Sequence, residues 1–139
     1  MTGRRNAVLL DTHVLVWLVE GDERLSMLAR AAIDEAGDQV WISAITPWEI
    51  GMLASKGRLR LGQEVAQWMD AVLALPGVRL AELSPAIAIA SSCLPGAPHG
   101  DPADRIIAAT ARHLDLTLVT ADQKLLDQGA RGYLRVVAA

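Results

Sequence analysis

The chain has 139 residues, of which 52% are hydrophobic and 21% are charged, and its formal net charge is -3. This length corresponds to one domain that can bury its own core, and the apolar fraction excludes a disordered chain. No run of about 18 uncharged apolar residues is present, so we expect no membrane span. The single Cys93 cannot form an internal disulfide, which favours a reducing cytoplasm. The mild acidity, taken alone, argues against a nucleic acid partner.

Short apolar runs alternate with amphipathic segments in the first half of the chain. After a polar stretch at 1–6 that we expect to be frayed, the pattern predicts these elements in order: a strand at 7–10, helices at 13–19 and 25–36, a strand at 40–43, and helices at 47–55 and 64–75. The two threonines that precede the first and third of these helices, Thr12 and Thr46, are the expected N-caps.

The same alternation continues to the end of the chain. The pattern predicts a strand at 78–83, a helix at 85–94, a proline- and glycine-rich loop at 95–102, a helix at 103–114, a strand at 117–120, a short helix at 123–128 and a strand at 134–137. Most strands are apolar on both faces, which is typical of a parallel sheet covered by helices. The predicted fold class is α/β: a single three-layer α/β/α domain over 1–139, with a central, mostly parallel sheet of about five strands.

Acidic residues follow the strands of this predicted sheet. Asp11 comes directly after the first strand, Glu49 lies shortly beyond the second, and Asp122 follows the fourth. Asp101 and Asp104 open the helix that leads into the fourth strand. Because sites in open parallel sheets lie outside the carboxyl ends of the strands, these acids mark the candidate site.

Most of these acids also have a structural interpretation. Glu49 would complete a capping box with Thr46, and Asp101 and Asp122 would cap the helices that follow them. Asp11, directly after a buried strand, is the hardest to explain in this way. If several of the carboxylates lie together, their repulsion destabilises the fold unless a cation neutralises them. Hard oxygen ligands suit Mg²⁺ or Mn²⁺, and such ions assist the hydrolysis of phosphodiesters.

Four blocks of sequence carry a resemblance to a known family. They are LDTHVLVWL at 10–18, ISAITPWEI at 42–50, HGDPADRIIAATA at 99–111 and LVTAD at 118–122. On these blocks, the chain from Leu9 to about Leu134 resembles the PIN-domain ribonucleases, and most closely the toxins of VapBC-type toxin–antitoxin pairs.

The resemblance implies a catalytic site formed by Asp11, Glu49, Asp104 and Asp122. Asp11 and Asp104 would be the principal ligands of Mg²⁺, with Mn²⁺ as the alternative ion, and Glu49 and Asp122 would complete the site directly or through water. The implied supporting residues are Asp101, Thr12 and Thr120.

The chain departs from the family pattern at two positions near the site. Ala103 stands where the family commonly has Phe, and Ala121 stands where it often has Arg. Neither change removes a predicted metal ligand, although the second removes a positive charge. A short basic patch, Lys56, Arg58 and Arg60, follows the helix that carries Glu49 and could guide an RNA backbone.

Aromatic residues of the first and third helices also lie near the candidate site. His13 stands beside Asp11 and could face substrate, but a structural, hydrogen-bonded histidine is the preferred interpretation. Trp17 and Trp48 could border a partner groove, although core packing is the preferred interpretation of each.

The resemblance implies a Mg²⁺-dependent endoribonuclease, the toxin of a type II toxin–antitoxin pair, which hydrolyses RNA by metal-activated water in the cytoplasm of a prokaryote. It also implies a homodimer that pairs with a cognate antitoxin, and the antitoxin would bind operator DNA. The alternative is a catalytically silent PIN-like interaction module. An aspartyl phosphatase is disfavoured because it needs a second Asp two residues after the first, where this chain has His13.

Overall fold

The structure, a computed structural model, describes residues 6–96 and 100–139. Residues 1–5, within the stretch predicted to be frayed, and residues 97–99, within the proline- and glycine-rich loop, lie outside the described residues. In the described part, one sheet has the strand order β3-β2-β1-β4-β5, and every pairing is parallel. The strands are β1 (Val8–Leu10), β2 (Val40–Ser43), β3 (Val78–Ala81), β4 (Thr117–Thr120) and β5 (Val136–Ala138). The predicted sheet is confirmed.

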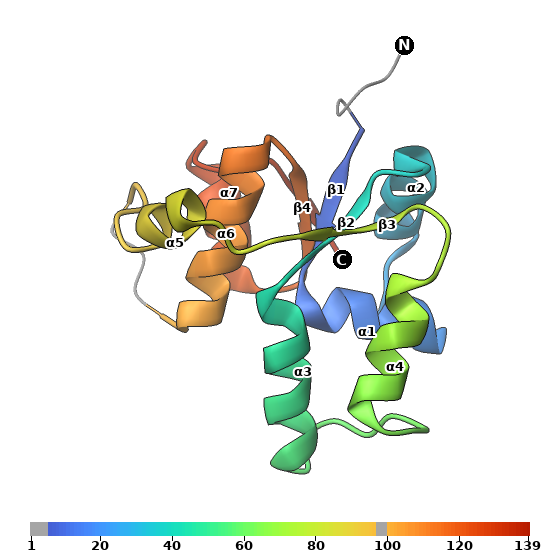
Figure 1. Cartoon of the computed structure of the whole chain (residues 1–139). Coiled ribbons are helices and arrows are strands. Elements are labelled where there is room, and N and C mark those ends of the chain that lie inside the picture. The colour runs from blue at the N-terminus through green and yellow to red at the C-terminus, as the bar shows by residue number, and fades with distance from the viewer. Residues whose placement is uncertain (1–5, 97–99) are drawn as a thin grey trace.

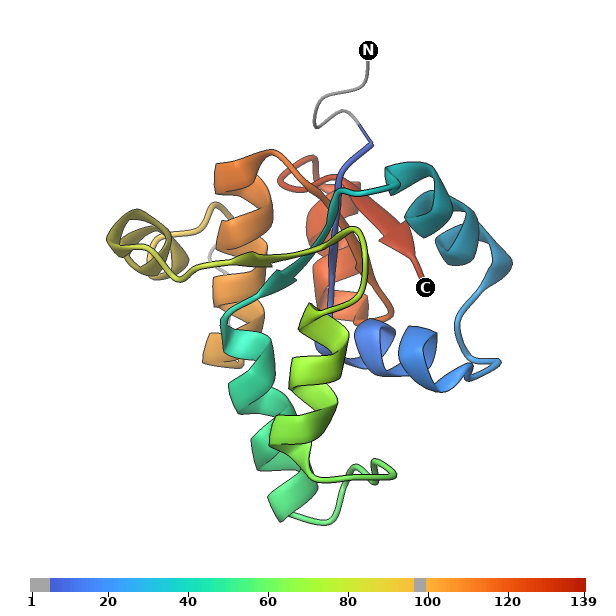
Figure 2. The same cartoon turned by 45° about the vertical axis from the view of Figure 1, so that its right-hand side comes forward.

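Helices cover both faces of the sheet (Figures 1 and 2). Those in the described residues are α1 (Thr12–Glu20), α2 (Met27–Ala36), α3 (Ile45–Ser55), α4 (Val65–Leu73), α5 (Pro85–Ser91), α6 (Pro102–Leu114) and α7 (Gln123–Ala130). One hydrophobic cluster joins α1, α2 and α4 to one face, and a second joins α6 and α7 to the other. The three-layer α/β/α class is therefore confirmed. None of the helices in this part of the chain combines the length and apolarity that a membrane span requires.

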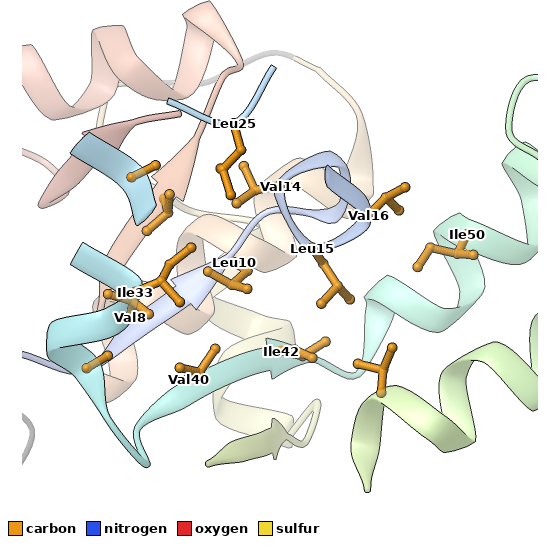
Figure 3. Packing of buried hydrophobic residues seen from close by; sticks show 14 of the residues in the cluster. Val8, Leu10, Val14, Leu15, Val16, Leu25, Ile33, Val40, Ile42 and Ile50 are labelled. Atoms are coloured by element: carbon orange, nitrogen blue, oxygen red, sulfur yellow. The ribbon is translucent and has the colours of Figure 1, made fainter. Parts of the chain in front are cut away.

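The central strands are buried on both faces, as their continuous apolar sequences predict. Val8 and Leu10 of β1 belong to one cluster, whereas Leu9 between them belongs to the other, because successive side chains of a strand alternate between the two faces. Figure 3 shows Val8 and Leu10 with Val40 and Ile42 of β2, packed with side chains of α1 and α2. This core fixes β1 and β2 beneath the helices that follow them.

The prediction of a strand at 78–83 is only partly right. β3 ends at Ala81, and Leu80 within it is 41% exposed. Leu80 is exposed because β3 is the outermost strand of the sheet and pairs with β2 alone. An edge strand carries the same kind of apolar residues as a buried one, so the sequence pattern does not separate the two cases.

The topology brings several chain segments together at the carboxyl ends of the strands, which we call the carboxyl edge of the sheet. α1, α3 and α7 follow the carboxyl ends of β1, β2 and β4, three neighbouring strands. α6 leads into the start of β4, so its first turn lies at the same carboxyl edge, and it packs against α3. In Figures 1 and 2, α3 extends away from this edge, beyond the sheet.

Candidate functional site

The five acids singled out from the sequence line one cavity of about 440 Å³ at the carboxyl edge of the sheet. Asp11 follows β1, Asp122 follows β4, and the backbone N–H of Asp11 donates to Val119 of β4 at 3.0 Å. Glu49 projects from the second turn of α3, and Asp101 and Asp104 belong to the start of α6. The structure thus brings together residues from four separate segments of the chain.

Asp11 is held in place through both of its carboxylate oxygens. It is the N-cap of α1, where Oδ1 accepts a hydrogen bond from the backbone N–H of Thr12 at 2.9 Å. Oδ2 accepts a hydrogen bond from the hydroxyl of Thr120 at 2.6 Å. The side chain is only 7% exposed, and this burial raises the pKa of Asp11 despite the two hydrogen bonds. The predicted cap at Thr12 is wrong by one residue, because Asp11 takes that position.

The capping box predicted for Glu49 does not form. α3 begins at Ile45, one residue before Thr46, and has no side-chain cap, so Thr46 lies inside the helix. Its buried hydroxyl oxygen lies 3.5 Å from that of Thr12 on α1. Glu49 is also buried, and its Oε1 accepts a hydrogen bond from the Thr12 hydroxyl. The structural interpretation of Glu49 as part of a cap is therefore wrong.

The charge of Asp11 also acts on the pKa of Glu49. Burial raises the pKa of Glu49, the Thr12 hydrogen bond opposes that shift, and the charges of Asp11 and Asp101 add to it. A buried carboxylate held by a single hydroxyl and facing other carboxylates is costly to ionise. This cost is unusual for a residue with a purely structural role.

Asp104 shows the mutual repulsion of the acids most clearly. It is half-buried in the first turn of α6. Burial, together with the charges of Asp11, Asp122, Asp101 and Glu49, raises the pKa of Asp104 to about 7. At neutral pH, burial and the neighbouring carboxylates therefore oppose the ionisation of Asp104, and ionising all five acids would destabilise the fold.

Asp101 and Asp122 combine capping with a place in the cavity, as the sequence predicts for their caps. Oδ1 of Asp101 accepts from the backbone N–H of Ala103 at 2.8 Å at the start of α6. Oδ1 of Asp122 accepts from Lys124 and Leu125 at the start of α7. In both side chains, Oδ2 takes no part in the cap. A helix cap and a second role at the site are thus compatible.

The donor set of this cavity fits a hard divalent cation. No group of three or more His, Cys, Asp or Glu side chains in residues 6–96 and 100–139 is already arranged to hold an ion. Mg²⁺ does not need such a group, because it is usually held by one or two carboxylates and keeps several waters. Asp11 and Asp104 are the residues that could hold it, and the two engaged oxygens of Asp11 each keep a free lone pair. A cation there would relieve the repulsion that raises the pKa of Asp104.

The predicted basic patch is divided by the structure. Arg58 lines the acidic cavity, whereas Lys56 and Arg60 are exposed and are not among its lining residues. Of the two departures from the family pattern, Ala103 is buried and Ala121 lines the cavity. Arg58 therefore supplies a positive charge to the cavity, although position 121, where the family often has Arg, is alanine.

Side chains other than the acids and Arg58 also line this cavity. His13 and Trp17 of α1 face it. Trp17 also packs against the hydrophobic core, so its core interpretation is right but incomplete. His13 is exposed at the cavity, and the interpretation of it as a hydrogen-bonded structural residue stays a prediction. Met52 and Leu53 of α3 line it as well. The available signal was spacing: His13 and Trp17 share a helix face, and Met52 and Leu53 lie one turn beyond Glu49. Core packing is the wrong expectation for Trp48, which is 57% exposed.

Comparisons with known proteins agree with this fold. Residues 8–130 match the family model of the PIN domain. Ribonuclease VapC22 of Mycobacterium tuberculosis is 39% identical over 118 residues, which cover 85% of this chain and 88% of that protein. A toxin–antitoxin complex from Klebsiella pneumoniae contains a chain that is 27% identical, with a TM-score of 0.65, over 94% of this chain and 96% of that one.

A further solved structure, a DNA-bound VapBC from Salmonella typhimurium, contains a chain with a TM-score of 0.68 and 17% identity, over 95% of this chain and 97% of that one. At this identity, the similarity concerns the fold alone. The family model spans most of the chain, and the similarity to VapC22 extends over most of both proteins. The chain therefore belongs to the PIN domain family and is a relative of VapC22.

Proposed function

We propose that the protein is a divalent-metal-dependent endoribonuclease and the toxin of a type II toxin–antitoxin pair. The observation that carries this proposal is the convergence of acids from four segments on one cavity, in a chain similar to Ribonuclease VapC22. Burial and the charges of the neighbouring acids raise the pKa of Asp104, and a bound cation would offset both effects, which supports the proposal. Mg²⁺ is the proposed ion, with Mn²⁺ as the alternative.

In this proposal, Asp11 and Asp104 hold the ion, and Glu49 and Asp122 complete the site directly or through water. A bound divalent ion supplies charge neutralisation, polarises a phosphate oxygen and lowers the pKa of water. Thr12 fixes the orientation of the Glu49 carboxylate by its hydrogen bond.

Thr120 does the same for Asp11 and also accepts a hydrogen bond from the backbone N–H of Asp122 at 3.0 Å, so a single hydroxyl ties two of the acids together. Arg58, which also lines the cavity, would contact the RNA backbone. The reaction is hydrolysis: water attacks phosphorus in line, the bond to the leaving ribose oxygen breaks, and the 2′-hydroxyl takes no part.

The proposed partners are a cognate antitoxin that restrains the enzyme and a second copy of the chain. The antitoxin in turn would bind operator DNA, and the complex would act in the cytoplasm of a prokaryote. Support comes from the solved structures with this fold, which include a toxin–antitoxin complex and DNA-bound VapBC complexes.

The test compares the purified wild-type protein with Asp11→Asn and Asp104→Asn for cleavage of candidate RNAs while Mg²⁺ is titrated. The matched control is Asp34→Asn, which changes an exposed carboxylate of α2 outside the cavity. We expect Mg²⁺-dependent cleavage by the wild type and the control, and a loss of at least about 100-fold in both site variants. Equal cleavage by all four proteins would identify a contaminant, and no cleavage of any RNA would favour the silent interaction module.

A further inference from the structure

The acidic cavity is lined not only by carboxylates but also by side chains of α1 and α3. On α1, His13 and Trp17 are four residues apart and therefore share one helix face. On α3, Met52 and Leu53 lie one turn beyond Glu49, and α1 packs against α3. These four side chains line the same cavity as the acids, and we call their part of it the α1–α3 arm.

Trp17 presents its ring to this arm from a supported position. Its side chain is half-buried and packs against the hydrophobic core. The guanidinium carbon of Arg24 lies 5.2 Å from the centroid of the indole, and Arg24 is itself held by an ion pair with Asp22 at 2.6 Å. The ring centroid of His13 lies 6.4 Å from that of Trp17, with the ring planes tilted by 51°. Two aromatic rings thus stand next to each other at the edge of the acidic site.

The arm also carries a positive charge. Arg58 follows the end of α3 and is the one lysine or arginine among the described residues that line this cavity. An aromatic pair, an apolar wall and an arginine next to a carboxylate cluster form a composition that suits a nucleotide: rings for a base and a guanidinium for a phosphate. The cavity volume of about 440 Å³ falls within the range of about 300–1,000 Å³ that is typical of ligand pockets.

We propose that the α1–α3 arm binds the nucleotide adjacent to the scissile phosphate of single-stranded RNA, with its base stacked on Trp17 and flanked by His13, and its phosphate paired with Arg58. This inference rests on the proposed function, because RNA bound at the acids must continue into a neighbouring space. An unpaired base can leave its stack and enter the arm, whereas a base within a duplex must first lose its pairing as well, which costs free energy. The enzyme should therefore act on unpaired RNA.

The test measures binding rather than cleavage, in an Asp11→Asn background with Mg²⁺ present. The probes are a mixed-sequence single-stranded RNA of eight nucleotides, the same RNA annealed to its complement, and the same RNA with abasic sites. The protein variants are Trp17→Leu, which removes the aromatic ring, and Trp17→Phe, which keeps one. The matched control is Trp48→Leu, because Trp48 is an exposed tryptophan that does not line the cavity.

We expect Trp17→Leu to weaken single-strand binding by about 5- to 150-fold, as loss of one stacked base does, and Trp17→Phe and Trp48→Leu to retain most of it. Binding should quench tryptophan fluorescence in the parent and in Trp48→Leu, but not in Trp17→Phe. The abasic and duplex probes should bind the parent weakly. The abasic probe tests the idea without any change at Trp17, so a folding defect in Trp17→Leu would not mask the result.

Equal affinity for the intact and abasic probes, or quenching that survives in Trp17→Phe, would overturn the inference. So would RNA binding that is indifferent to Trp17 while binding of a protein partner depends on it, because the arm would then be a peptide groove. Failure of the proposed function looks different. In that case, the wild-type protein cleaves no RNA, whatever its affinity for the three probes.

Discussion

The pKa of Asp104 is raised by the charges of all four other acids of the site, in addition to burial. Burial and four neighbouring carboxylates raise its pKa in the folded protein to about 7, from an ordinary value of 3.8. Between these two pH values, the folded protein binds a proton that the unfolded chain does not. By linkage, the contribution of Asp104 to the free energy of unfolding of the metal-free protein then rises as the pH falls from about 7 towards 4.

We therefore expect the metal-free protein to be more stable at pH 5.5 than at pH 7.5 in urea unfolding. Asp104→Asn should stabilise it at pH 7.5 by about 1–2 kcal/mol, less than the full pKa shift implies because solvent screens a half-buried group, and should flatten the pH dependence. Asp34→Asn, at an exposed site on α2, serves as the control. Stability that is constant or increases from pH 5.5 to 7.5 would contradict the raised pKa.

Thr120 is the second residue for which the structure predicts a specific effect on stability. Its buried hydroxyl donates to Asp11 and accepts from the backbone N–H of Asp122. Thr120→Val keeps the shape but leaves both partners without that hydrogen bond, so it should cost about 1–3 kcal/mol in urea unfolding. Thr120→Ser retains the hydroxyl and should recover most of this loss. A Val variant that is as stable as the wild type would contradict the role of the hydrogen bonds, because Val keeps the threonine methyl group and loses only the hydroxyl.

At the scale of elements, the sequence pattern predicts which segments are strands or helices better than it predicts how their ends are used. Period and apolarity report burial, and they place β1, β2, β4 and α6 correctly to within a residue or two. The start of α3 is wrong because local capping rules apply to Thr46 in isolation, whereas its hydroxyl faces Thr12 on another helix. For Trp17, the expectation of core packing is right but incomplete, because this half-buried residue packs on the core and also lines the cavity.

Convergence of the acids could be anticipated from the sheet rule, since Asp11, Glu49 and Asp122 each follow a strand. The hydrogen bonds that orient them could not, because they join positions far apart in the chain, such as Thr12 with Glu49 and Thr120 with Asp11. No local pattern encodes such pairs. They depend on the neighbours that the strand order β2-β1-β4 creates.

At the start of α6, the capping role of Asp101 can be tested separately from the effect of its charge. Asp101 caps this helix three residues before Asp104, and it also faces the cavity. Asp101→Ala removes the cap and should destabilise the protein by about 0.5–2 kcal/mol in thermal or urea unfolding. Asp101→Asn keeps a capping oxygen and should be close to the wild type in stability. A large loss in the Asn variant would show that the charge of Asp101, rather than its capping oxygen, supports the helix.

For the whole molecule, the net charge of -3 has a different meaning once the charges are located. Asp11, Glu49, Asp104 and Asp122 carry four of the negative charges, so the rest of the chain carries a net charge of +1. The acidity that argues against an RNA partner is thus concentrated at one edge of the sheet. A divalent ion bound there would cancel half of it, which makes the location of charge more informative than its sum.

This concentration predicts how the whole fold responds to a metal. An ion that binds only the folded state stabilises it by mass action, by about 2.7 kcal/mol at 100 times its Kd, which for a chain of this size corresponds to a rise in Tm of about 5–10 °C. Mg²⁺ or Mn²⁺ should produce this rise in a thermal melt, and EDTA should reverse it. NaCl at matched ionic strength should produce much less, because it only screens the acids. The variant Asp104→Asn should start from a higher Tm without metal, since one repelling charge is gone, and should lose most of the response to the divalent ion. If that variant responds as the wild type does, the ion binds elsewhere on the protein, and the cavity at the carboxyl edge is not the metal site.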